Sequence, residues 1–255
     1  MFPIGDDNSD RTTTPIVNYI LIAANILVFV LFQGLGSNDR FTYAWATVPQ
    51  EIVTGRDVVT APHVVQDPVS GDRFEEPGLQ PTPGSVYLTL LTSMFMHGSI
   101  MHIFGNMLFL WIFGDNLEDR MGHVRYLIFY LVCGVIASLA HVFSTVLFGG
   151  NQIVPSLGAS GAISGVLGGY VLLFPKRRVR VILFRFLTTV PAYVALGIWF
   201  AFQLISGIGL LGGGAEADGV AYAAHIGGFI AGLVLVKLFD QGARAASQPQ
   251  WFGRG

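Results

Sequence analysis

The sequence predicts an all-α, polytopic membrane protein with six transmembrane helices, because it is apolar, poor in charge and divided into long uncharged segments. Of its 255 residues, 52% are apolar and 12% are charged, and the mean hydropathy is +0.59. A soluble domain carries roughly 25% charged residues, so this chain has too few to cover a globule with a hydrated surface. The net charge of −2 provides no field for a polyanion, and we expect no nucleic-acid partner.

Six segments without Asp, Glu, Lys or Arg are long enough to cross a bilayer, which requires about 20 mostly apolar residues. They are Thr12–Asn38, apolar from Ile16 to Phe32; Pro77–Gly114, apolar mainly from Leu88; the two halves of Tyr126–Pro175, divided by a turn-forming stretch at residues 148–155; Phe186–Ala215; and Gly219–Val236. Because these segments are predicted to be helical, the fold class is all-α.

Basic residues predict that both chain ends lie on the cytoplasmic side. Only three of the 14 Lys and Arg residues, Arg40, Arg56 and Arg73, fall in the segments that would then face outward. We therefore expect a cytoplasmic N-terminal segment over residues 1–14, a six-helix membrane domain over 15–240 and a loosely ordered cytoplasmic tail over 241–255. An outer loop insertion covers about residues 35–90, and its Pro- and Gly-rich part Gln50–Pro83 is expected to be irregular.

Polar side chains within the predicted spans are candidates for function, because a polar group in hydrocarbon is costly unless it is paired or lines a wet cavity. His97, His102 and Asn106 belong to the second span, Ser160 to the fourth and His225 to the sixth. At ~1.5 Å per residue, Ser160 and His225 lie roughly 22–24 Å from the inner surface and His102 about 20 Å. This agreement in depth predicts a shared site in the outer part of the bilayer.

Small residues accompany the polar ones on the fourth and sixth spans. Gly158 and Gly161 flank the serine of the fourth span, and Gly228 and Gly232 follow the histidine of the sixth. Small residues at four-residue spacing let helix backbones touch in lipid. We expect these glycines to pack the two helices together and bring the hydroxyl and the imidazole within reach.

These side chains suit nucleophilic catalysis. A serine hydroxyl needs a base, so we expect Ser160 to be the nucleophile and His225 the general base and then the acid for the leaving amine. The Ser160 backbone N–H near a helix start, with the side chains of Asn106 and His102, would stabilise the oxyanion. No carboxylate lies at this depth, which predicts a dyad. His97 is a supporting residue or touches water near the outer surface.

Other intramembrane hydrolytic chemistries fit less well. The sequence has no His-Glu-x-x-His motif, and the five-residue spacing of His97 and His102 is poor for a helical metal pair. No pair of intramembrane aspartates is present. We expect neither a metal nor an organic cofactor.

Three motifs in order resemble the rhomboid family of intramembrane serine proteases. The run Gly158-Ala159-Ser160-Gly161 is similar to their nucleophile motif, Ala224-His225-Ile226-Gly227-Gly228 to their final-helix motif, and residues 97–106, HGSIMHIFGN, to their second-helix motif. Gly114, Glu118, Gly122 and Arg125 resemble the polar turn that follows. The resemblance runs from about Ser93 to Leu238 and implies a six-helix, rhomboid-like bundle.

The resemblance implies a serine endopeptidase that cuts transmembrane segments of other membrane proteins near the outer face, with the fifth span as lateral gate. Its partners would be transmembrane substrates and the lipid bilayer. Helix-weakening residues such as Gly or Pro should favour cleavage, because a helix hides its own peptide bonds. We also expect the protein to lie in a bacterial plasma membrane. The physiological substrate and the oligomeric state stay open.

Two departures from the family pattern are present. Many members carry Tyr four residues after the nucleophile, where this chain has Ser164, so the orientation of His225 stays open. Leu88-Thr89 stands where the family often has Trp-Arg. Two alternatives also remain: a catalytically inactive relative that binds and escorts transmembrane clients, and a transporter, whose polar residues would extend across the membrane.

Overall fold

The computed structural model is mainly helical and describes residues 2–66, 71, 73–211, 221–240 and 242. Six of its helices overlap the predicted spans: α1 (Ile16–Leu27, continued by a π-helical turn Val28–Phe32), α5 (Ile100–Met121), α6 (His123–Leu147), α7 (Ser160–Leu173), α8 (Ala192–Leu211) and α9 (Tyr222–Phe239). Among the described residues, α5, α6 and α9 are long and apolar enough to cross a membrane, whereas 16–32, 160–173 and 192–208 are shorter. The count of six crossings therefore stays a prediction.

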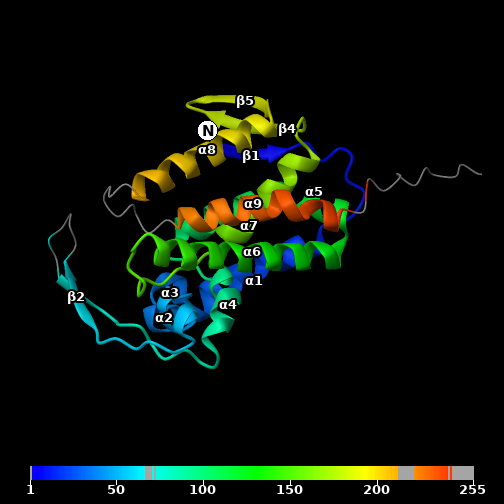
Figure 1. Ribbon diagram of the computed structural model, residues 1–255. Helices are drawn as coiled ribbons and strands as arrows, with labels where there is room; N and C mark the ends of the chain where they lie inside the picture. The colour runs from blue at the N-terminus through cyan, green and yellow to red at the C-terminus, as the bar shows by residue number, and fades with distance from the viewer. Residues whose placement is uncertain (1, 67–70, 72, 212–220, 241, 243–255) are drawn as a thin grey trace, which may run out of the picture.

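Helix α7 is the central helix of the bundle. Every residue from Gly161 to Tyr170 is buried. Helix α9 packs along it, and α6 packs against both (Figure 1). A Cβ atom at Gly228 would overlap the carbonyl oxygen of Gly161, and one at Gly232 would overlap the carbonyl oxygen of Gly165. The small residues therefore let the backbones of α7 and α9 touch.

The second predicted span is broken before its helix begins. Residues Val86–Leu88, Thr89–Thr92 (α4) and Ser93–Phe95 form separate short helical turns, and α5 starts only at Ile100. Ser99 is the N-cap of α5, and its side chain accepts a hydrogen bond from the His102 N–H at 3.1 Å. His97 therefore lies in the turn before α5 rather than on it.

The all-α prediction is wrong where a three-stranded antiparallel sheet forms, with the order β1 (Phe2–Asp6), β4 (Arg178–Leu183) and β5 (Phe186–Pro191) (Figure 1). In β4, buried Val179 and Val181 alternate with exposed Arg178 and Arg180, the period-two pattern of a strand. The fifth helix consequently begins at Ala192 and not at Phe186. Phe186–Pro191 belongs to an uncharged segment. Hydropathy alone therefore did not distinguish this strand from the helix that follows it.

The outer insertion is more regular than predicted. It contains α2 (Asp39–Trp45), α3 (Pro49–Thr54) and an antiparallel hairpin of β2 (His63–Gln66) and β3 (Arg73–Glu76). A proline at the first turn starts α3, and Gly55 ends it with a φ of 66°. The hairpin projects away from the helices (Figure 1). Apart from residue 242, the predicted loose tail over 241–255 lies outside the described residues.

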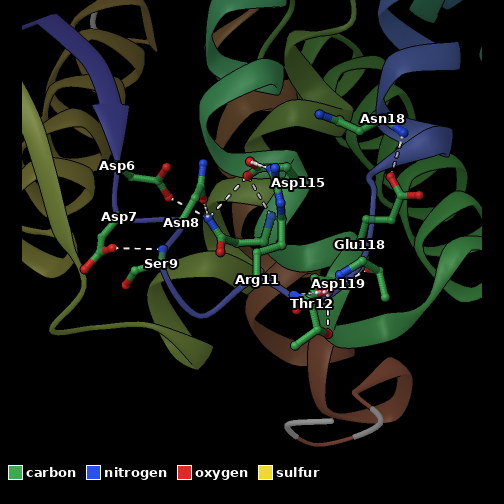
Figure 2. Close-up of polar contacts among 12 residues, drawn as sticks. Asp6, Asp7, Asn8, Ser9, Arg11, Thr12, Asn18, Asp115, Glu118 and Asp119 are labelled. Carbon is green, nitrogen blue, oxygen red and sulfur yellow. Dashed lines mark hydrogen bonds and ion pairs between the residues drawn. The ribbon is translucent and has the colours of Figure 1, made fainter. Parts of the chain in front are cut away.

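The N-terminal segment is fastened to the C-terminal end of α5. The carboxylate of Glu118 accepts hydrogen bonds from the backbone N–H groups of Val17 and Asn18 at 2.9 and 2.7 Å, which caps α1. Arg11 forms an ion pair with Asp115 at 2.5 Å, close to Glu118 in Figure 2. The polar turn that resembles a family motif thus has a structural task here, because it joins α1 to α5.

Candidate active site

A serine and a histidine from different helices meet at one end of the bundle. Ser160 is the first residue of α7, and His225 lies in the first turn of α9. The Nε2 atom of His225 is 2.8 Å from the Oγ atom of Ser160, which is a hydrogen bond. Both residues are half-buried. The close approach of α7 and α9 at Gly161 and Gly228 makes this distance attainable.

The pair opens into a cavity of about 700 Å³ formed by α5, α7, α8 and α9. Its polar lining comes from Ser99, His102, Asn106, Ser160, Ser164 and His225, and its apolar walls include Met101, Phe109, Ile163, Leu167 and Trp199. One water occupies about 30 Å³ in the liquid, so the cavity has room for water together with a stretch of extended peptide.

His102 presents a donor to this cavity. The backbone N–H of Gly98 donates to Nδ1 of His102 at 3.3 Å, which puts the proton of a neutral ring on Nε2. A methyl group added to Gly158 would lie 3.0 Å from that Nε2 and 3.7 Å from Oγ of Ser160. The space beside Gly158 is therefore shared by the two side chains.

Gly158 has a different task from the helix packing predicted for it. It precedes α7 and has a φ of 128°, a conformation that a residue with a Cβ rarely adopts. Its N–H donates to the carbonyl of Ser93 at 2.9 Å. It approaches His102 of α5 rather than a small residue of α9, and it keeps the space beside the serine empty.

Asn106 supplies a second donor one turn after His102. Its side chain is 7% exposed and lines the cavity, and its Nδ2 has no hydrogen-bond partner among the described residues. The backbone N–H of Ser160 is at the start of α7, where N–H groups lack partners within the helix. Donors from His102, Asn106 and Ser160 therefore surround one space, an arrangement that can stabilise a developing negative charge.

His97 lies behind His102 rather than in the cavity wall. Its ring is fully buried and meets the ring of His102 edge-on, with the centroids 5.1 Å apart. The side chain of Gln33 accepts from the His97 N–H at 2.9 Å and donates to the His97 carbonyl at 3.1 Å. Its position suits support of the His102 ring.

The sequence reading missed Gln203 of α8. Its Oε1 is 2.7 Å from Nδ1 of His225, and its side chain is 6% exposed. The sequence shows an amide side chain within an uncharged apolar segment, but this pattern does not indicate which residue the amide contacts.

Ser164 does not hydrogen-bond to the imidazole of His225 through its hydroxyl. The hydroxyl donates to the carbonyl of Ser160 at 2.6 Å, within its own helix. Glu216 and Asp218, the carboxylates that precede α9 in the sequence, lie outside the described residues.

Comparison with known proteins gives one family. A family model for the rhomboid domain matches residues 84–241. The chain is 28% identical to Rhomboid protein 1, mitochondrial, of Saccharomyces cerevisiae over 216 residues, 85% of this chain and 51% of that protein. It is 31% identical to the human Presenilin-associated rhomboid-like protein, mitochondrial, over 144 residues, 56% of this chain and 36% of that protein.

A bacterial relative is also similar. The chain is 36% identical to Rhomboid protease GluP of Bacillus subtilis over 146 residues, 56% of this chain and 24% of that protein. The chain thus spans about half or less of the length of these three curated relatives. Two of the three are named as mitochondrial, so the predicted bacterial plasma membrane is not supported, whereas an integral membrane location is.

Proposed function

Because the chain belongs to the rhomboid family, we propose that it is an intramembrane serine endopeptidase that cleaves transmembrane segments of other membrane proteins near the outer face of the bilayer. The observation that carries the proposal is the 2.8 Å hydrogen bond between Oγ of Ser160 and Nε2 of His225. A nucleophile and a base within hydrogen-bond reach are the signature of covalent acyl-transfer catalysis. Both termini would lie on the same side of the membrane, with six crossings between them.

In the acylation step, Oγ of Ser160 attacks the scissile carbonyl while Nε2 of His225 takes the hydroxyl proton. The tetrahedral oxyanion forms in the space beside Gly158, where Nε2–H of His102, Nδ2–H of Asn106 and the Ser160 N–H can donate to it. The imidazolium then protonates the leaving amine. A water activated by the same imidazole hydrolyses the acyl-enzyme.

The shape of the cavity supports an unwound membrane segment as substrate. An intact helix satisfies its own peptide groups, so its scissile bond is hidden until the segment extends. Apolar walls from α5, α7 and α8 accept side chains that come from lipid, and the polar centre accepts the exposed backbone. Segments with Gly or Pro near the outer interface should therefore be preferred, with α8 as the side of entry.

The test is cleavage of a single-span reporter by purified protein in detergent and in vesicles. We expect Ser160→Ala and His225→Ala each to lower kcat on the order of 10⁴-fold or more, because the nucleophile and its base act as a unit. A fluorophosphonate probe should label the wild type and not Ser160→Ala. Ser144→Ala on α6, which removes a hydroxyl outside the cavity, is the matched control and should keep both signals.

The escort alternative predicts a different result. A non-catalytic binder would co-purify with single-span clients, react with no fluorophosphonate and cut nothing, with or without the serine. Retention of both the nucleophile and the base in hydrogen-bond contact favours catalysis. Wild-type cleavage by both alanine variants would show that the dyad is assigned to the wrong residues.

A further inference from the structure

We propose that Gln203 is a positioning residue that holds the imidazole of His225 in the tautomer needed for catalysis. The inference rests on the function proposed above and extends the dyad to a line of three side chains, Ser160, His225 and Gln203. Each comes from a different helix: α7, α9 and α8. The predicted dyad left the orientation of its imidazole to packing or weaker hydrogen bonds, and Gln203 supplies a specific partner.

The two hydrogen bonds of His225 agree on one tautomer. A neutral imidazole has one donor nitrogen and one acceptor nitrogen. The Oε1 atom of Gln203, 2.7 Å from Nδ1, only accepts, so Nδ1 carries the proton. The Nε2 atom is then free to accept the proton of Ser160 across 2.8 Å. A base with its proton on Nε2 would be unable to activate the serine.

Aromatic side chains from α8 and α9 pack around the ring. Trp199 lies one turn before Gln203 on α8, so the two side chains share a helix face, and its ring is 6.0 Å from the imidazole at an interplanar angle of 38°. Tyr222 meets the imidazole edge-on at 6.4 Å. These contacts take the place of the Tyr absent at position 164, whose Ser164 hydroxyl bonds within α7.

An amide suits this position better than a carboxylate. Gln203 is 6% exposed, and a buried charge in a membrane protein is costly unless it is paired. In the described part of the chain, the titratable side chains that face His225 are His102 of α5, His141 of α6 and Tyr222 of its own helix. The amide therefore selects the tautomer without adding a charge.

The experiment compares a substitution that removes the acceptor oxygen at position 203 with one that keeps it. Gln203→Leu keeps much of the volume and removes the acceptor, whereas Gln203→Glu keeps an acceptor oxygen. We expect Gln203→Leu to lower kcat about 10- to 100-fold with KM nearly unchanged, a fraction of the roughly 10²–10⁴ that general acid–base catalysis supplies. Gln203→Glu should restore most of kcat. Its carboxylate stabilises the imidazolium, so the acidic limb of the kcat/KM profile should move to higher pH.

The matched control is Ile205→Ala, two residues along α8, where the side chain is 70% exposed. It should leave kcat and the pH profile unchanged. A second readout needs no activity: ¹⁵N chemical shifts of the His225 ring should show a proton on Nδ1 in the wild type. They should show a mixture of tautomers in Gln203→Leu.

The outcomes separate the two proposals. Wild-type kcat and an unchanged tautomer in Gln203→Leu would overturn the role of Gln203 while leaving the dyad intact. Cleavage by Ser160→Ala would overturn the dyad, and the ring shifts would still test the Gln203–His225 bond. Should Gln203→Leu not fold, the folded Gln203→Glu variant decides: an acidic limb at the wild-type pH would contradict the proposal.

Discussion

Asn106 is the single side chain whose hydrogen bonding most directly supports the proposed role of the cavity. Buried donors in folded proteins nearly always have a hydrogen-bond partner. The Nδ2 donor of Asn106 has none among the described residues, although its side chain lines the same space as His102 and Ser160. Leaving a buried donor unsatisfied costs stability, and in the proposed mechanism that cost is offset when a negative charge forms beside Nδ2 in the transition state.

At this residue we predict that Asn106→Ala lowers kcat by about 10²–10³, the effect of removing one oxyanion donor, and changes KM little. The reason is that the side chain meets charge that develops only in the transition state. Steady-state cleavage of the reporter measures both constants. A loss confined to KM would assign Asn106 to ground-state binding instead.

Between elements, the contact of α7 with α9 sets the distance between Ser160 and His225. The backbones touch because Gly228 and Gly232 face backbone atoms of Gly161 and Gly165. A backbone oxygen cannot rotate away from an added methyl group as a side chain can. Separation of the two helices at these positions would lengthen the Ser160–His225 hydrogen bond directly.

We predict that Gly228→Ala destabilises the protein by roughly 1–3 kcal/mol, the usual cost of overpacking, and reduces cleavage by forcing the helices apart. Gly197→Ala on α8 is the matched control, because a Cβ there meets nothing within 4 Å. It should keep activity and leave the melting temperature equal or higher, since Ala favours a helix interior. Equal melting temperatures for both variants would contradict this account of the α7–α9 contact.

Across the whole molecule, the N-terminal strand joins the ends of several helices. Asp6 of β1 accepts hydrogen bonds from the Tyr170 hydroxyl of α7 at 2.5 Å and from Nδ2 of Asn116 of α5 at 2.8 Å. Figure 2 shows Asp6 at the end of its strand, with Asp115 of α5 nearby. Burial raises the pKa of the Asp6 carboxyl from 3.8 to about 6, although the hydrogen bond from Tyr170 opposes the shift.

This shift predicts a pH dependence of stability. Between pH 4 and 6 the folded protein holds a proton that the unfolded chain has lost, so the free energy of unfolding should fall as pH rises, by about 3 kcal/mol for the shift from 3.8 to about 6. Asp6→Asn removes this titration and should flatten the curve over that range. Melting temperatures measured from pH 4 to 8 compare the two proteins. Parallel curves would show that Asp6 does not titrate there.

Part of the fold and site followed from the sequence, because hydropathy and motifs are local properties. The uncharged segments indicated where most helices lie, and helical rise indicated that His102, Ser160 and His225 share one level. The depth of a residue along the membrane normal can be estimated from residue counts alone, because each helical residue rises by a fixed amount. The structure places all three around one cavity.

What only the tertiary structure decided are the features that depend on partners distant in the chain. The strand at Phe186–Pro191 exists because it pairs with β4, which itself pairs with the N-terminus, and no local signal separated it from the apolar helix that follows. Likewise, the contact of Gln203 with His225 depends on how α8 is rotated about its own axis. That rotation is set by packing against neighbouring helices, so it appears only when the whole bundle is assembled.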